Sequence, residues 1–243
     1  MNEMNDAHRA YYTRYITTEL GNRVDLLEKV LPTYPPFGKR MLMDNGWYKM
    51  LSNEKVELID NAVVDIKENQ IRTEDGSTYE ADVLVVATGF DVLRFNTTYE
   101  VKGRGGLSLR DKWDDDNAKA YMGTTVPEFP NFYMLYGPNL QPGHGGSLIF
   151  VVEMQVHYIM DILKKMSSQN VAAVECRQEV CDSYNEGVDA AHEKLVWTHE
   201  GMSSYYRNNR GRIVVNSPYR NVDYYAMTRV ANLEDFYLES ANL

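Results

Sequence analysis

The chain has 243 residues, enough for one large domain or two small ones with hydrophobic cores. Hydrophobic residues make up 44% and charged residues 25%, and the 18 tyrosines exclude the composition of a disordered chain. The formal net charge of -10 argues against non-specific binding of nucleic acid, which needs a basic surface to displace counterions. Part of this charge lies in residues 111–116 (DKWDDD), which we interpret as a solvated acidic loop.

The cysteines and the polar N-terminus indicate the compartment. Cys176 and Cys181 are five residues apart, which is not the CxxC spacing of redox or zinc motifs, so we expect two reduced thiols. The first twelve residues have no apolar core and do not read as a signal peptide. The most apolar run, residues 148–152, is too short to cross a bilayer. These features predict a cytoplasmic protein with neither a membrane nor a nucleic acid as partner.

The first third of the chain begins with helical spacing. Apolar residues at helical intervals predict a helix from Asn5 to about Leu31, capped by Asn5 or Asp6. Three prolines in residues 32–36 then require an extended segment. One further helical turn is expected at residues 47–50.

Residues 55–90 have the pattern of β-structure. We predict strands at 56–59, 62–66, 70–73 and 78–80, with the Asp75-Gly76 pair in a tight hairpin turn between the last two. The β-branched run at 82–87 is typical of a strand buried on both faces, as in the parallel sheet of an α/β domain. It ends at Thr88-Gly89.

The second half begins with a loop-rich stretch, residues 91–130. A strand is expected at 131–136, followed by a glycine-rich loop at 143–146. Ser147 then opens the longest predicted helix, which runs to about Met166 and whose first half is apolar on nearly all sides and therefore expected to be buried. A second helix is predicted at 183–196, and residues 197–243 show little periodicity.

Several short patterns carry no specific chemistry. Residues 103–106 (GRGG) lack the GxGxxG spacing and are interpreted as a turn. His192-Glu193 resembles the start of a zinc-protease helix, but the required second histidine position, 196, is valine. Glu153 and His157 share a helix face without a third ligand. We therefore predict no metal site.

Three features are more informative, although each also has a simple structural interpretation. Backbone can approach a ligand closely at Thr88-Gly89 and at residues 136–139, because small side chains leave room beyond a strand end. The free N–H groups where a helix starts at Ser147 can bind electron-rich atoms. Lys39-Arg40 follows a rigid proline segment that would hold both cations. The alternatives are packing glycines and an exposed basic pair.

The combination of motifs resembles one family. Residues 34–40 (YPPFGKR), 44–48 (DNGWY) and 56–59 (VELI) look like the middle of Baeyer–Villiger monooxygenases. Residues 82–90 (DVLVVATGF) resemble the ATG motif of flavin-containing monooxygenases, and 129–139 (FPNFYMLYGPN) are similar to their second FAD-domain strand and loop. The tail is most similar to the 4-hydroxyacetophenone monooxygenase type; it carries 197–199 (WTH), 204–208 (SYYRN) and 211–213 (GRI). The match extends from about residue 20 to 230.

The resemblance implies the fold and also shows what is missing. Family members are about twice as long and carry glycine-rich fingerprints for FAD and for NADPH, neither of which occurs here. The expected fold is α/β: a partial flavoprotein with two Rossmann-like dinucleotide-binding domains, without the N-terminal FAD fingerprint and with a helical C-terminal part. We expect residues 1–90 to be the C-terminal half of the NADPH-binding domain with an N-terminal helix. Residues 91–170 would be the returning segment of the FAD-binding domain, and 171–243 a helical and loop-rich tail.

The resemblance also implies a reaction and its residues. In the family, NADPH reduces FAD, and the reduced flavin activates dioxygen for insertion of one oxygen atom next to a ketone carbonyl, giving an ester or lactone. Arg40 matches the active-site arginine, and Lys39 matches the residue that reads the 2′-phosphate of NADPH. The residues implied in cofactor binding are Thr88, Gly89, Gly137, Asn139, Ser147, Leu148 and Tyr205. At Tyr205 many relatives carry tryptophan.

Two other functions stay open at this point. A chain without both fingerprints has no evident place for either pyrophosphate, so it could be an inactive fragment or a subunit that completes a partner flavoprotein. A flavin-containing monooxygenase acting on nitrogen or sulfur is the third interpretation, and Lys39-Arg40 favours the Baeyer–Villiger branch over it.

Overall fold

The computed structural model describes residues 3–95 and 98–241. It divides into two compact units. Unit 1 contains the residues up to Pro36 together with Leu42–Phe90, and unit 2 contains Phe37–Met41 together with the chain from Asp91 onwards. Residues 91–170 and 171–243, predicted from the sequence as separate parts, both lie in unit 2.

Unit 1 begins with helices that share a small core. α1 (Glu3–Leu20) ends where Gly21 adopts a left-handed φ of 58°, a conformation that glycine takes without steric cost. η1 (Val24–Leu26) and α2 (Leu27–Val30) follow, so the single helix predicted for residues 5–31 is wrong in its second half. The expected turn at 47–50 is confirmed as α3 (Trp47–Leu51), where an Asp44 carboxylate oxygen accepts from the Trp47 N–H at 2.6 Å.

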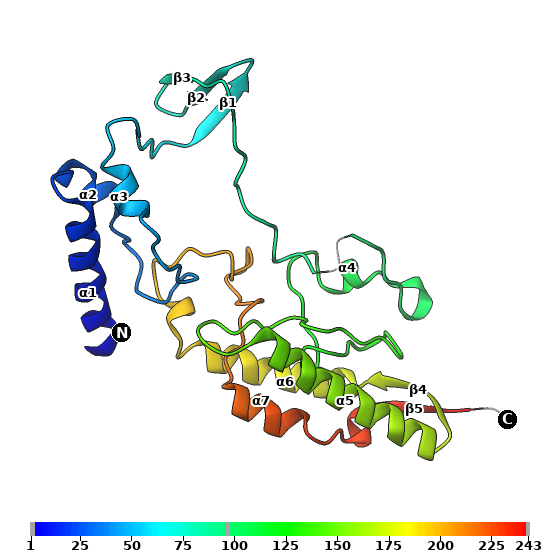
Figure 1. Ribbon diagram of the computed structural model, residues 1–243. Helices are drawn as coiled ribbons and strands as arrows, with labels where there is room; N and C mark the ends of the chain where they lie inside the picture. Colours follow the sequence, from blue (N-terminus) through cyan, green and yellow to red (C-terminus); the bar gives the residue numbers. More distant parts are fainter. Residues whose placement is uncertain (1–2, 96–97, 242–243) are drawn as a thin grey trace. The chain divides into compact units, whose positions relative to one another are not determined.

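The sheet of unit 1 has three antiparallel strands in chain order, β1 (Val63–Lys67), β2 (Gln70–Thr73) and β3 (Thr78–Glu80). These confirm three of the predicted strands, and the hairpin turn is confirmed by Gly76 at a φ of 88°. The strand predicted at 56–59 is wrong: Val56 and Leu58 pack against the helical core without entering a sheet. The three strands form a small sheet (Figure 1), and side chains on both faces of β1 are exposed.

The predicted buried strand at 82–87 is also wrong. The segment belongs to no described strand, and its side chains are open to solvent, with Val83 at 78% and Val85 at 80% exposure. A parallel strand exists only when a neighbour accepts and donates its backbone hydrogen bonds. Both described sheets are antiparallel and neither includes residues 82–87, so none of the described strands pairs with this apolar run.

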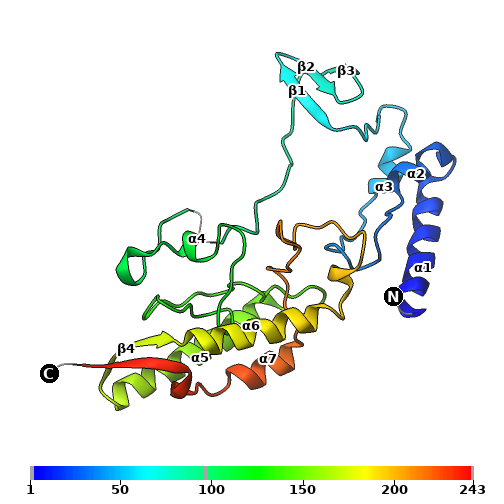
Figure 2. The same ribbon diagram turned by 180° about the vertical axis from the view of Figure 1, so that it is seen from behind.

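Unit 2 is built around the long helix α5 (Leu148–Ser168). α7 (Asn221–Thr228) packs against it, and β4 (Val171–Cys176) returns beside it (Figure 1). β4 pairs antiparallel with β5 (Phe236–Ser240), which the sequence did not predict, and α6 (Gln178–His192) follows β4 (Figure 2). The main core is formed from these elements; among its fully buried members are Tyr158, Ile162 and Phe236. Shorter elements are η2 (Arg104–Gly106), α4 (Leu109–Lys112), η3 (Val196–Thr198) and η4 (Leu233–Asp235).

Two further predictions for unit 2 need correction. No strand forms at 131–136, because Asn131 and Tyr136 at its ends both have a φ of 55°, which breaks an extended ladder. The long helix is confirmed, but its first half is buried on one face only: Val151 and Met154 lie in the core, whereas Leu148 and Ile149 are exposed. The helix predicted at 183–196 forms as α6, shifted toward the N-terminus. None of the described helices is long and apolar enough to span a membrane.

Candidate functional site

The loop from Gly137 to Ser147, here the glycine loop, is fixed at its start by backbone contact. A Cβ at Gly137 would lie 2.3 Å from the carbonyl oxygen of Gly123, so only glycine lets these two backbones approach. Gln155 of α5 is fully buried below it. Its amide oxygen accepts from the Tyr136 N–H at 2.6 Å, and its amide nitrogen donates to Met134 O and Thr124 Oγ1 at 3.1 and 2.9 Å. One α5 side chain thus sets where the loop begins.

Asn139 secures the next part of the loop rather than facing solvent. It is 2% exposed and has a left-handed φ of 57°, a conformation in which asparagine is favoured among non-glycine residues. Its amide nitrogen donates to Ile213 O at 2.8 Å, and its amide oxygen accepts from Arg212 at 3.2 Å. The Asn139 N–H donates to Val214 O at 2.8 Å. The side chain of this predicted cofactor-binding residue is therefore occupied by protein contacts.

The middle of the glycine loop meets Phe37–Met41, here the arginine segment. Phe37 O lies 2.8 Å from His144 Nε2 and accepts the Trp197 indole N–H at 3.2 Å. Arg40 is exposed, and its guanidinium donates to Pro142 O at 3.4 Å. Lys39 is half-buried. Within unit 2, Arg40 and the glycine loop are therefore brought together.

The charge of Arg40 acts on two nearby phenols. Burial raises the pKa of Tyr136, and the positive charge of Arg40 lowers it. The pKa of Tyr206 is raised, by burial first and by its bond with Tyr205, while Arg40 again lowers it. Tyr205 is 45% exposed, and its hydroxyl donates to that of Tyr206 at 3.3 Å. The charge of Arg40 therefore reaches Tyr136, which directly precedes the loop, and the hydrogen-bonded Tyr205-Tyr206 pair.

At the end of the loop, α5 starts without a side-chain cap. Ser147 occupies the N-cap position in an extended conformation, and its hydroxyl makes no capping bond. Gly145 and Gly146 precede it with φ values of 72° and 76°. Leu148 is 49% exposed, and Ile149 and Phe150 beside it are also exposed. The helix start therefore presents backbone N–H groups next to apolar side chains.

Thr88 and Gly89 belong to unit 1. Both are exposed and lie in no helix or strand, and Gly89 has a φ of 86°. The strand end predicted at this junction is not formed by the described residues.

Sequence reasoning missed the residues that hold the site together. Gln155 could have been found as the single amide in the apolar first half of α5. Trp197 appeared only as part of a family motif, and no pattern linked it to Phe37, which lies 160 residues earlier. Pairings over such distances have no periodic signal in a sequence.

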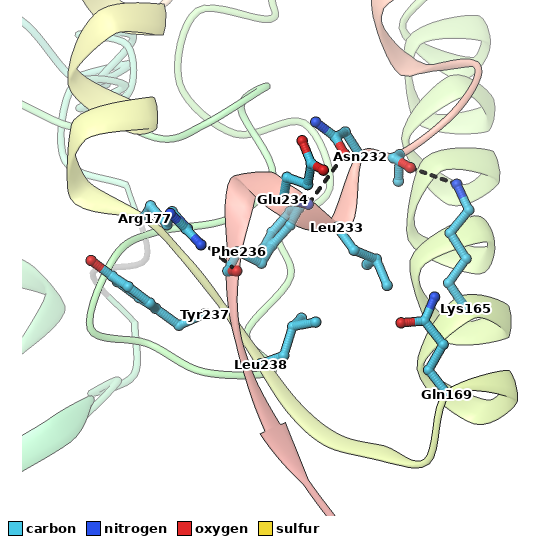
Figure 3. Close-up of a pocket in the computed structure, with 10 residues that line it drawn as sticks. Lys165, Gln169, Arg177, Asn232, Leu233, Glu234, Phe236, Tyr237 and Leu238 are labelled. Atoms are coloured by element: carbon cyan, nitrogen blue, oxygen red, sulfur yellow. Dashed lines mark hydrogen bonds between the residues drawn. The ribbon is translucent and has the colours of Figure 1, made fainter.

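A separate hollow of about 640 Å³ lies between the end of α5 and the β4–β5 pair, and none of the predicted site residues lines it (Figure 3). The two cationic side chains that line it, Lys165 and Arg177, are both bound to other residues of the chain. Lys165 Nζ donates to Asp161 at 2.7 Å and to Ala231 O at 2.5 Å. Arg177 lies 5.1 Å from the centre of the Tyr237 ring and donates to Phe236 O. Lys165 thus holds the segment before β5 against α5, and Arg177, at the start of α6, contacts β5. Both cations have structural roles.

Comparison with known proteins identifies several monooxygenases as relatives of this chain. No protein-family model matches the chain. An uncharacterized monooxygenase of Sinorhizobium fredii is 48% identical over 236 residues, which is 97% of this chain and 36% of the relative. A Baeyer–Villiger monooxygenase of Pseudomonas aeruginosa is 32% identical over 75% of this chain and 34% of its own length. An FAD-binding monooxygenase of Aspergillus niger is 30% identical over 93% of this chain and 38% of its own length.

Solved structures agree in fold. Cyclohexanone monooxygenase from Rhodococcus sp. Phi1, crystallised with NADP⁺, superposes with a TM-score of 0.83 at 27% identity over 99% of this chain and 46% of that protein. A steroid monooxygenase bound to NADP superposes with a TM-score of 0.81 at 25% identity, covering 98% and 46%. The chain spans less than half the length of the relatives it matches, and its α/β fold is part of theirs, as expected. Over almost all of its length, this chain is therefore homologous to a part of the Baeyer–Villiger and FAD-binding monooxygenases.

Proposed function

We propose that the chain is the C-terminal part of an NADPH- and FAD-dependent Baeyer–Villiger monooxygenase, which inserts one oxygen atom into a ketone to give an ester or lactone. The observation that carries the proposal is the docking of the arginine segment on the glycine loop, through Arg40 and Pro142, in a chain homologous to such enzymes. The tail motifs at 197–213 favour a relative of the 4-hydroxyacetophenone type.

The described residues suit one end of FAD. The glycine loop ends at a helix start whose backbone N–H groups can bind flavin carbonyl oxygens, and Leu148 offers an apolar contact. A side chain at Gly145 would meet open space, so the loop is not filled there. In this role Gly137 and Asn139 hold the loop in shape, and Ser147 begins the helix. When bound, FAD supplies the electrons and the activation of dioxygen.

Arg40 is the proposed catalytic residue. Its guanidinium keeps its charge at all working pH values and would stabilise negative charge that develops beside the loop. Lys39, next to it, would contact the 2′-phosphate of NADPH. Tyr205, half-exposed in the same cluster, would contact the nicotinamide nucleotide or the substrate. Thr88 and Gly89 would lie at the dinucleotide-binding junction.

Arg40→Ala in the complete enzyme tests the catalytic role. Loss of a charge that acts only on the developing negative charge should lower ester formation by about 100-fold or more, while NADPH oxidation continues in part. Product by gas chromatography and NADPH by absorbance at the same time point give both rates. Arg40→Lys keeps the charge without the planar fork and should retain more product. Ester formation at the normal rate by Arg40→Ala would exclude the role.

Lys39→Ala tests cofactor recognition separately. The variant should raise the KM for NADPH much more than the KM for NADH, because only NADPH carries the 2′-phosphate. Steady-state oxidation of both nucleotides measures the two constants. Equal increases would show that Lys39 does not contact that phosphate.

A second proposal concerns the rest of the fold. Both described sheets are antiparallel, so the described residues do not supply the strand, glycine-rich turn and helix that hold a cofactor pyrophosphate. Apolar residues 83–86 and the outer face of α5 are exposed, as expected for surfaces that another polypeptide segment covers. We therefore propose that a further segment, in the same chain or in a partner chain, completes the enzyme, and that residues 1–243 alone are inactive.

A further inference from the structure

The carbonyl oxygen of Phe37 receives two hydrogen bonds from side chains far along the chain. His144 Nε2 lies 2.8 Å from it and the Trp197 indole nitrogen 3.2 Å. Because a carbonyl oxygen only accepts, both nitrogens must carry their protons. The Phe37 and His144 rings also meet edge to face at 4.8 Å. The arginine segment is therefore tied to the glycine loop and to η3 through one backbone atom.

Trp197 is built into this position. Its side chain is buried, and its ring meets those of His192 and Tyr206 edge to face at 5.7 and 6.3 Å. A Cβ at Gly143 would lie 2.1 Å from the Trp197 ring, so the glycine lets the indole lie directly against the loop backbone. The indole ring thus lies against the glycine loop at Gly143, and its N–H donates to the arginine segment.

Phe37 needs such a tie. Its φ of 66° is in the left-handed region, which is unfavourable for an aromatic residue and persists only where the surroundings impose it. Without the two donors, Phe37 would relax toward ordinary φ values. Since Arg40 is three residues further on, relaxation at Phe37 would move its guanidinium relative to the loop.

We propose that Trp197, assisted by His144, is a positioning residue that clamps the arginine segment onto the glycine loop and so fixes Arg40 for the reaction. Its part in the reaction rests on the proposed function, whereas the clamp itself does not. Trp197 acts on Arg40 through the backbone of Phe37 and makes no direct contribution to the chemistry.

Limited trypsin digestion of the 243-residue chain tests the clamp without any cofactor. Trypsin cuts after Lys39 and Arg40 only when the segment leaves its site, so the cutting rate reports the open population. Trp197→Phe should raise that rate roughly two- to tenfold, the equilibrium equivalent of one lost hydrogen bond. His144→Phe should act similarly, and the double variant should exceed about tenfold. Cleavage after Lys55, an exposed residue of unit 1, is the reference within each digest.

Trp113→Phe is the matched control. Trp113 is also buried in unit 2, and its indole nitrogen donates to Lys119 O at 2.8 Å, so the variant loses a comparable bond elsewhere. It should leave cleavage at Lys39 and Arg40 unchanged relative to Lys55. The clamp is wrong if the Trp197→Phe and His144→Phe double variant is cut at Lys39 and Arg40 no faster than wild type. It is also wrong if Trp113→Phe is cut at these sites as fast as the double variant.

A second arm, in the complete enzyme, tests the positioning role. The double clamp variant should form at least about tenfold less ester per NADPH oxidised. When Arg40→Ala is already present, adding the clamp variants should not lower NADPH oxidation further, because effects exerted through one residue are not additive. A further fall would mean general structural damage and would overturn the positioning role. Absence of ester from wild type would refute the proposed function, while the digestion result would still decide the clamp.

Discussion

Among single residues, His192 shows most clearly how burial controls ionisation. The side chain is 2% exposed, at the end of α6. Its Nε2 lies 3.1 Å from Asn216 O, and its other nitrogen has no hydrogen-bond partner among residues 3–95 and 98–241. Burial lowers the pKa of His192 to about 4, against a weaker upward influence of the Asn216 carbonyl and of Asp189; Arg212 lowers it further. The ring that packs on Trp197 is therefore neutral at pH 7.

This pKa predicts a loss of stability in mild acid. Below pH 6.5 the unfolded chain binds a proton at His192 and the folded chain does not, until the pH reaches about 4. The free energy of unfolding should therefore be fully retained above pH 6.5 and fall by up to about 3 kcal/mol between pH 6.5 and 4. Urea unfolding of wild type and His192→Gln at several pH values measures it. The two proteins should diverge only in this interval, and parallel curves would contradict the prediction.

At the scale of elements, two glycines of unit 2 have opposite consequences for stability. Gly137 lies against the Gly123 backbone, whereas Gly187 lies inside α6, where a Cβ would meet only the Tyr219 hydroxyl, at 3.6 Å. Gly137→Ala should destabilise by at least about 2 kcal/mol, because backbone must move. Gly187→Ala should stabilise by about 0.5–1 kcal/mol, since alanine favours the helix. Thermal unfolding compares them, and similar shifts in both would refute the contact at Gly137.

The elements also show how far the sequence could be interpreted. α3, α5 and the β1–β3 hairpins were predictable, because capping, helical spacing and an Asp-Gly turn are local signals. The runs at 82–87 and 131–136 were not. An apolar β-branched run becomes a strand only beside a partner, and Asn131 and Tyr136 turn left-handed for reasons outside their own segment. Of the candidate site, Lys39-Arg40 and the glycine loop could be proposed from the sequence, whereas their connection through Phe37, His144 and Trp197 could not.

At the scale of the whole molecule, the main prediction concerns FAD. In the proposed function the described residues contact one end of the cofactor and supply no pyrophosphate cradle, and each lost charge-assisted hydrogen bond removes about 1.5–3 kcal/mol of binding. The purified 243-residue chain should therefore be colourless and should not oxidise NADPH. Adding the N-terminal part of the Sinorhizobium fredii relative should give a yellow complex. Stoichiometric FAD in the isolated chain, measured by absorbance, would contradict the proposal that a further segment is needed.

The assignment of Phe37–Met41 to unit 2, between two stretches of unit 1, has a consequence for biogenesis. The ribosome releases these five residues long before it makes His144 and Trp197, so early in synthesis they have nothing to bind. Their docking closes loops of 107 and 160 residues, a non-local step that comes late in folding. A nascent chain stalled before residue 197 should therefore carry an open, protease-sensitive arginine segment, and closure would mark the completion of unit 2.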